Sequence, residues 1–347
     1  MKPSPPPQQN RFGRLRRIGA VAAVIILGTA VAVAIGYRRL SPVVEPTAPA
    51  APTAGGSAMV IDGIQQTAAR DGVTEWVLNA RSGTFLQAEK KFLLEEPRVT
   101  FFRPGGQTFF LSARHGSVAT DSHDMEAEGD VVVWNDRYRV RTERVHYVHA
   151  DRLIESDRPV AITADRREIT AAAGSVDLQA NRMRLEGEVR GEIPAESGGN
   201  GHDAVRVASD RLLVDLDADS AEFSGRARFT EKNTVTSADS ITVYTAPRQG
   251  RSGTTAADLE AVAVDRVVAR GRVVIQAENS TAEAEEAVYE PDTGALTLTG
   301  RHAELRSPSV TLRGQRVVVS MRTNEMTAEG GPAGRVSVVW TPSGSRP

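Results

Sequence analysis

Apolar and charged residues alternate with a period of two over most of the chain after residue 57. The stretch Met125–Val160 shows the pattern best, because Tyr138, Val140 and Thr142 interleave there with arginines and a glutamate. In a pleated strand this alternation sends one set of side chains to a buried face and the other to solvent. The pattern therefore predicts antiparallel strands with one dry face and one wet face.

A glycine recurs inside these segments at a nearly constant spacing. Gly129 and Gly187 are 58 positions apart, Gly271 and Gly300 are 29 apart, and Gly300 and Gly330 are 30 apart. A period in this range is typical of supersecondary units that stack and share one core. A leucine-rich repeat has a similar period, but the chain has no asparagine ladder or leucine consensus. We interpret each repeat as two strands of roughly 10 residues.

The first 57 residues differ from the rest. Ile18–Tyr37 contains no charge, and at about 1.5 Å per residue a helix of this length spans the ~30 Å hydrocarbon layer. A cleaved signal peptide is the alternative, since Ala30-Val31-Ala32 resembles a cleavage site. The apolar run is long for a signal core and arginines follow it at once, which favours an uncleaved anchor. The excess of arginines before the run places the amino terminus in the cytoplasm.

The composition shifts give predicted boundaries. These are a cytoplasmic terminus 1–17, a transmembrane helix 18–37, a proline-rich linker 38–57, a β domain 58–194, a glycine-rich linker 195–204, a second β domain 205–341 and a tail 342–347. A mobile loop is expected at 247–256 and a tight turn at 291–294. Residues 282–289 contain good helix formers, but they occupy a repeat position where a strand is expected, and we predict a strand there.

Charge and motifs exclude most kinds of chemistry. The chain has 42 basic and 44 acidic residues, no cysteine, and no motif for a nucleotide phosphate, a zinc protease or a serine hydrolase. His146 and His149, at i and i+3 of a strand, point to opposite faces and are not expected to share a metal. The remaining histidines are isolated and are predicted to be solvated. We expect no cofactor, no metal site, no nucleic-acid partner and no enzymatic activity.

The predicted dry face mixes large and small side chains, which can either fill a core or leave a groove. Both interpretations fit the pattern. The candidate groove residues are Trp76, Phe101, Phe110, Trp134, Tyr147 and Leu185 in the first domain and Leu216, Phe223, Val273, Leu298 and Leu312 in the second. The facing of Trp134 is open, because it is out of phase with Val131 and Val133.

The order of several segments resembles the LptC family, the membrane-anchored periplasmic component of lipopolysaccharide export. An arginine-rich terminus, one apolar span and a linker precede Gly72–Ala80, Pro97–Phe102 and Leu111–Gly116. The second block, through Ala208-Ser209-Asp210 and Ala284–Tyr289, is similar to LptA, the soluble OstA-like component of the same bridge. The fusion departs from the common pattern, in which the two are separate chains.

The resemblance implies an all-β fold of two antiparallel OstA-like β-jellyrolls stacked end to end, preceded in the chain by one transmembrane helix. It also implies an inner-membrane, single-pass protein whose bulk is periplasmic and whose apolar groove carries lipopolysaccharide. The implied partners are the ABC transporter formed by LptB, LptF and LptG, and then LptA or the LptD translocon through edge-strand pairing. The alternatives are an envelope scaffold that binds only proteins and an enzyme acting on glycans or lipids, which would need clustered carboxylates.

Overall fold

The computed structural model describes residues 58–70, 72–102, 108–135, 139–164, 167–193, 204–245, 264–323, 325–330 and 336–340. Every regular element in these ranges is a β-strand, so the predicted all-β class is confirmed. Among these residues, no helix has the length and apolarity needed to cross a membrane. The predicted transmembrane segment 18–37, the linker 38–57 and the loop 247–256 lie outside the described residues.

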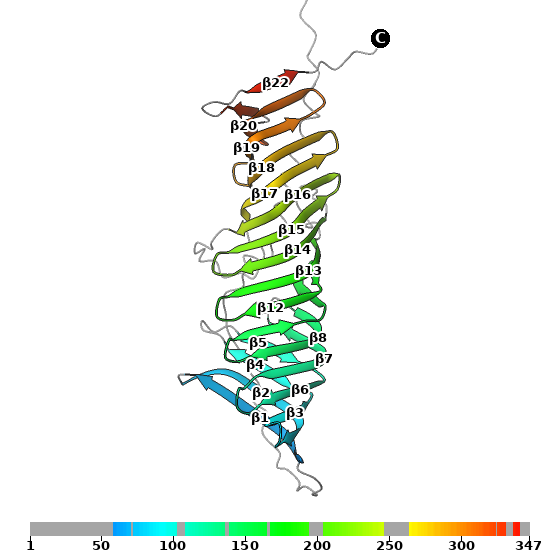
Figure 1. Cartoon of the computed structure of the whole chain (residues 1–347), viewed down its shortest axis with the longest axis vertical. Coiled ribbons are helices and arrows are strands. Elements are labelled where there is room, and N and C mark those ends of the chain that lie inside the picture. Colours follow the sequence, from blue (N-terminus) through cyan, green and yellow to red (C-terminus); the bar gives the residue numbers. More distant parts are fainter. Residues whose placement is uncertain are drawn as a thin grey trace, which may run out of the picture. The chain divides into compact units, whose positions relative to one another are not determined.

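The chain forms two compact units. The N-terminal unit contains the described residues up to Gly191 together with Arg211–Ala218, and the C-terminal unit contains Glu192–Asp210 and Asp219 onward. Figure 1 colours the strands of the first from blue to green and those of the second from green to red. Strand β14 (Val205–Asp215) supplies residues to both units, because the division falls after Asp210.

The N-terminal unit consists of long strands that each pair with two short ones. Its strands are β1 (Ala58–Arg70), β2 (Val73–Leu86), β3 (Lys91–Glu95), β4 (Arg98–Phe102), β5 (Thr108–Ser112), β6 (His115–Ala119), β7 (Met125–Trp134), β8 (Arg139–Val148), β9 (Leu153–Ser156), β10 (Val160–Ala164), β11 (Arg167–Ala171), β12 (Ala173–Asp177) and β13 (Arg182–Ile193). Strand β2 pairs with β3 and β4, β7 with β6 and β5, and β8 with β9 and β10, all antiparallel. The two halves of each long strand thus belong to two different layers, as in a jellyroll-like sandwich.

The C-terminal unit uses continuous strands instead. After β14 come β15 (Ser220–Glu231), β16 (Thr234–Thr245), β17 (Val264–Ala277), β18 (Ser280–Glu290), β19 (Ala295–Arg306), β20 (Val310–Ser320), β21 (Glu325–Glu329) and β22 (Ser337–Trp340). Each strand from β15 to β20 pairs antiparallel with the next. The segment 282–289 is part of strand β18, which confirms the strand prediction over its helix propensity.

A bulge marks the point where a strand crosses between layers. In β17 the register with β18 shifts between Arg270 and Val273, and Gly271 and Arg272 both have positive φ, at 73° and 48°. The same Gly-X pair with two positive φ values occurs at Gly129, Gly187 and Gly225. At Gly129, Gly187 and Gly271 the recurring glycine therefore marks a crossing, because glycine adopts this backbone conformation without steric cost. Gly300 is not followed by a residue with positive φ, and Gly330 lies after strand β21.

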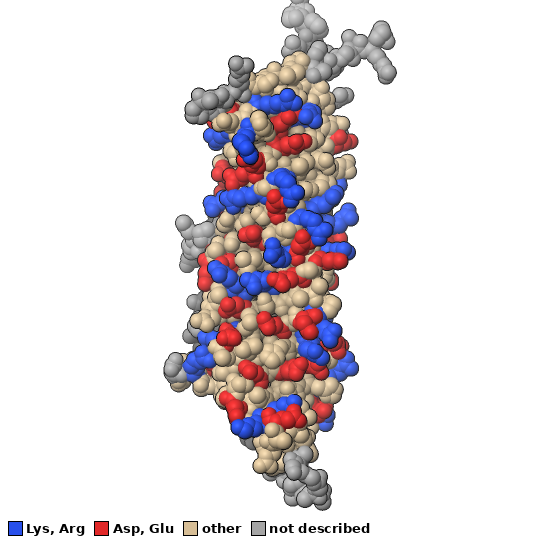
Figure 2. Space-filling view, in the orientation of Figure 1, with Lys and Arg blue, Asp and Glu red and all other residues tan. Residues whose placement is uncertain are grey.

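The crossing residues form exposed ion pairs. Arg272 hydrogen-bonds Asp239 through Nε at 3.0 Å, and Arg226 hydrogen-bonds Asp210 in the same way at 3.1 Å. Such solvent-exposed pairs contribute little to stability. Figure 2 shows that positive and negative side chains are interspersed over the visible face, as the alternation of the sequence predicts.

We predict that Gly271→Ala destabilises the C-terminal unit. A left-handed backbone costs a non-glycine residue about 1–2 kcal/mol, and a Cβ at position 271 would lie only 2.3 Å from an Asp239 carboxylate oxygen. Amide hydrogen exchange of β16 and β17 in the full-length protein measures the loss. In an Asp239→Ala background the same glycine substitution should cost less, since the carboxylate contact is gone and only the backbone strain and the 2.9 Å contact with the Cβ of residue 239 remain. Equal costs in both backgrounds would show that the carboxylate contact has no effect.

Candidate functional site

The interior of the N-terminal unit contains a cavity of about 150 Å³ with an almost wholly apolar wall. It lies between the two layers, bounded by strands β4, β5, β7 to β10 and β12 to β14. Its apolar wall residues are Phe101, Phe109, Val133, Trp134, Val140, Val145, Ile154, Val160, Ile162, Val176, Leu178, Met183, Leu185, Val214 and Leu216. A cavity of this size and lining can stay dry and hold an apolar guest.

The cavity exists because two neighbouring residues that face inward, Ser156 on β9 and Gly174 on β12, are small. Ser156 pairs with Gly174 across β9 and β12, and Gly174 pairs with Leu185 across β12 and β13. These two small residues leave space that larger neighbours would otherwise fill. A Cβ at Gly174 would already lie 3.0 Å from a methyl group of Leu185.

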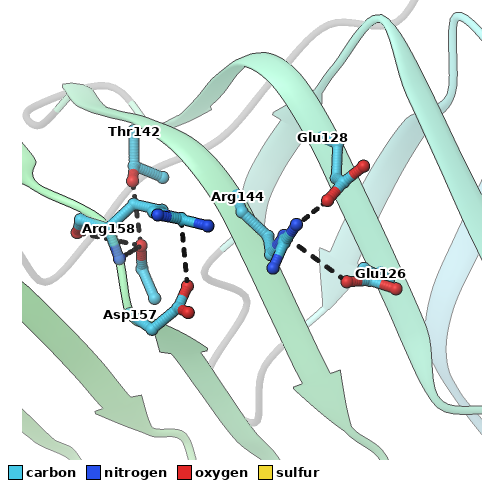
Figure 3. A network of polar contacts seen from close by, with 7 residues as sticks. Glu126, Glu128, Thr142, Arg144, Asp157 and Arg158 are labelled. Atoms are coloured by element: carbon cyan, nitrogen blue, oxygen red, sulfur yellow. Dashed lines mark hydrogen bonds and ion pairs between the residues drawn. The ribbon is translucent and has the colours of Figure 1, made fainter.

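Ser156 also satisfies the backbone at the break between β9 and β10. Its hydroxyl lies 2.8 Å from Thr142 Oγ1, accepts a hydrogen bond from Arg158 N at 3.3 Å, and donates one to Arg158 O at 3.2 Å. Figure 3 shows this network beside Arg144, which points toward Glu126 and Glu128. Because these polar groups bond one another, the wall needs no water at this position.

Four sequence candidates line this cavity, namely Phe101, Trp134, Leu185 and Leu216. Phe110 is not part of the wall: it lies across from Trp134 in β7, and the two rings stack with centroids 5.6 Å apart. Trp76 is fully buried and pairs with Phe101 across β2 and β4.

The C-terminal candidates lie in a well-packed interior. Phe223, Val273 and Leu298 are almost fully buried, and Leu312 is buried as well. The rings of Phe223 and Phe229 are perpendicular, with centroids 5.0 Å apart. Phe223 and Phe229 contact each other, and a lipid in this unit would have to displace buried side chains such as these.

The candidate set omitted several wall residues. Phe109, Val133, Val140, Ile162 and Met183 all line the cavity. Alternation provided the signal for them: Val140 is in phase with Thr142, and Met183 is in phase with Leu185. Most of the residues predicted from the sequence are large, and several are aromatic. Branched and flexible aliphatic side chains, however, form most of the wall.

A buried charged group lies beside this interior. The register between β1 and β2 shifts at Glu75, which is the extra residue on β2 and has no residue opposite it on β1. Its side chain is only 9% exposed. Arg70 Nε and Arg152 Nε lie 3.5 and 3.8 Å from its Oε1, and His149 Nε2 lies 3.7 Å from Oε2. Two nearby cations balance the buried charge, which would be costly alone.

The histidines near Glu75 correct one expectation. His123 was predicted to be isolated and solvated, but its ring is half-buried, 6.3 Å from the Trp76 ring and 5.4 Å from the His149 ring. Burial lowers the pKa of His149 below its usual value, with Glu75 opposing the shift. Burial also raises the pKa of Tyr147 to about 12. Among the described residues, no three or more acidic or histidine side chains are placed to hold a metal ion.

The fold and its interior define an all-β protein with an apolar internal cavity and no visible catalytic constellation in the described part. Residues 22–194 match the family model described as lipopolysaccharide-assembly, LptC-related, and residues 202–325 match that of the LptA/(LptD N-terminal domain) LPS transport protein. The chain thus belongs to the lipopolysaccharide transport proteins and joins an LptC-related part to an LptA-like part. The resemblance seen in the sequence is confirmed, and both families are transport families rather than enzyme families.

One solved structure similar to this chain is LptH from Pseudomonas aeruginosa, described as the LptA homologous periplasmic component of the lipopolysaccharide transport device. The identity is 15%, the match covers 40% of this chain and 95% of that chain, and the TM-score is 0.33. A likeness this low adds nothing to the fold described above. No curated protein matches the chain.

We predict that His149 makes stability depend on pH. The pKa of His149 is lower in the folded state than in the unfolded state. As the pH falls below about 6.5, the unfolded state therefore binds more protons than the folded state. Stability is lost as the pH falls from that value to the folded-state pKa. His149→Gln should reduce this loss, as measured by urea unfolding at neutral pH and at pH about 5. His146→Gln, an exposed change on β8, is the control. A His149→Gln protein with the full acid sensitivity of the parent would contradict the assignment.

Proposed function

We propose that the chain is a membrane-anchored periplasmic bridge that carries lipopolysaccharide from an inner-membrane ABC transporter toward the outer membrane. The observation that carries the proposal is the apolar cavity between the two layers of the LptC-related part, bounded by residues such as Phe101, Ile162 and Leu185. The acyl chains would lie in this interior while the sugars stay in solvent. Residues 18–37 would form the anchor, which puts the β units in the periplasm.

The size of the cavity limits what it can hold. An engineered cavity of roughly 150 Å³ accommodates a benzene-sized guest, so one segment of about six carbons fits. Each buried methylene contributes about 0.8 kcal/mol, which gives roughly 5 kcal/mol for such a segment. A lipid with several acyl chains is larger, and the two layers would have to separate to admit it.

The drive and the partners would come from outside this chain. Its sequence has no nucleotide-binding motif, so energy would be supplied by the LptB, LptF and LptG transporter. Met59 and Val60 on β1 are 53% and 57% exposed, and Val338 and Trp340 on β22 are 59% and 71% exposed. Such exposed apolar edges favour strand pairing with partners. We assign β1 to the transporter side and β22 to the LptA or LptD side.

The scaffold alternative is favoured by one feature, the tightly packed interior around Phe223 and Leu298. In that case the C-terminal unit would bind proteins and not lipid. The two interpretations differ in whether lipid reaches position 298.

A photocrosslinking amino acid at Phe101 or Leu298 distinguishes the interpretations. With the transporter and ATP, we expect lipopolysaccharide adducts at both positions, and none at Arg139, which is exposed on the outer face of β8. Adducts at position 101 alone would make the C-terminal unit a docking module. Adducts at neither position in a protease-resistant protein would support the scaffold. Capture at position 139 but not at 101 would reverse the assigned facing.

A matched pair on β13 tests the cavity itself. Met183 lines the cavity, and its neighbour Arg184 points outward and is exposed. Met183→Phe should fill part of the cavity and lower the adduct yield at position 101 by about tenfold, the effect of roughly 1.4 kcal/mol of lost binding. Arg184→Phe adds the same ring to the outer face and should leave the yield unchanged. Equal yields in both variants would exclude the cavity as the lipid site.

A further inference from the structure

A second, smaller cavity lies in the interior of the N-terminal unit. Its volume is about 20 Å³, and its wall includes Leu78, Leu94, Val99, Leu111 and Met125. The strands around it are β2 to β8, whereas the larger cavity reaches from β4 to β14. The two cavities therefore follow one another along the strand order of the unit.

Two residues, Phe101 and Val145, belong to the walls of both cavities. Val145 is short and its β-branched side chain has one strongly preferred rotamer. Phe101 carries a large ring, is only 3% exposed, and pairs with Trp76 on one side and Phe109 on the other. The ring of Phe101 is thus the larger part of the partition between the cavities.

The Phe101 ring is held in place by a chain of contacts. Tyr147 packs edge-on against it, with ring centroids 5.3 Å apart. The Tyr147 hydroxyl lies 3.4 Å from His149 Nδ1, and His149 lies beside the buried Glu75. The Phe101 ring is therefore packed against Tyr147 on the side of the smaller cavity, and it faces open volume on the side of the larger cavity.

We propose that Phe101 is the gate residue of this unit: the smaller cavity, at about 20 Å³, must widen to admit an acyl segment, and the Phe101 ring must move before an acyl chain in that widened space can enter the larger cavity. This inference rests on the proposed function and refines it, because it assigns control of acyl-chain movement to one side chain. The moving group is the saturated hydrocarbon of a lipid. The ring has only two rotatable bonds, and the larger cavity beside it gives it room to turn.

The test compares lipopolysaccharide adducts on the two sides of the gate. Photocrosslinkers are placed at Met125 in the smaller cavity and at Ile162 in the larger one, in the full-length chain reconstituted with its transporter and ATP. We expect Phe101→Ala to raise the ratio of Ile162 to Met125 adducts by about tenfold, and Phe101→Trp to lower it. Phe102→Ala is the control, since Phe102 follows Phe101 on β4 but is 39% exposed and lines neither cavity, and it should leave the ratio unchanged.

The outcomes separate the gate from the function. An unchanged ratio in both Phe101 variants, with adducts still formed at both positions, would overturn the gate and leave the proposed function standing. A shift as large with Phe102→Ala would also overturn it, because loss of an aromatic ring from β4 outside the partition would then explain the effect. Adducts at neither position in the parent protein would reject the proposed function. If Phe101→Ala loses protease resistance, Phe101→Leu serves instead, since it removes the ring and keeps the site apolar.

Discussion

Long strands of this protein such as β7, β15 and β17 cross from one layer of a sandwich to the other while their buried backbone stays hydrogen-bonded. An unpaired buried peptide group is costly, so the crossing cannot be an arbitrary bend. In β7, β15 and β17 it is made by a glycine and a following residue that both have positive φ, as at Gly271-Arg272. The extra residue of the bulge in β7 also changes which positions of its partner strand β8 face inward. Val140 and Thr142 line the cavity on one side of the crossing. Val145 and Tyr147, which are out of phase with them, are buried on the other side.

The two units share the glycine bulge at the crossing, but they differ in strand length and in how their interiors are filled. In the N-terminal unit, Ser156 and Gly174 leave space, and a serine at a strand break keeps the polar backbone satisfied. In the C-terminal unit, Phe223, Phe229 and Leu298 close the interior. A lipid entering there would replace contacts among side chains with contacts between side chains and methylenes. Because both sets are dispersion contacts of similar strength, the exchange costs little once the layers part.

The interior of the N-terminal unit also changes from apolar to charged over a short distance. Phe101 contacts Tyr147, Tyr147 reaches His149, and His149 lies beside Glu75. A buried carboxylate restricts how its surroundings can move, because any opening must keep it near its cations. The bulge in β2 that buries Glu75 thus ties the first hairpin to the turn after β8. The ion pairs at this end contrast with the open volume near β9 and β12.

The sequence alone determined the strand class, the repeat with its recurring glycine, and the family, because the alternation of apolar and charged residues and the spacing of a marker residue are visible along the chain without any arrangement of the strands. That the glycine marks a crossing was decided by the structure. The repeat also predicted a strand at β18, although its residues have a high helix propensity. Only the tertiary structure decided which apolar residues form a wall. Phe110 stacks on Trp134 outside the cavity, Gly174 and Ser156 create the cavity, Glu75 is buried, and His123 is half-buried beside Trp76. Those outcomes depend on strand register and on bulges, which pair residues far apart in the chain and leave no periodic signal at either position.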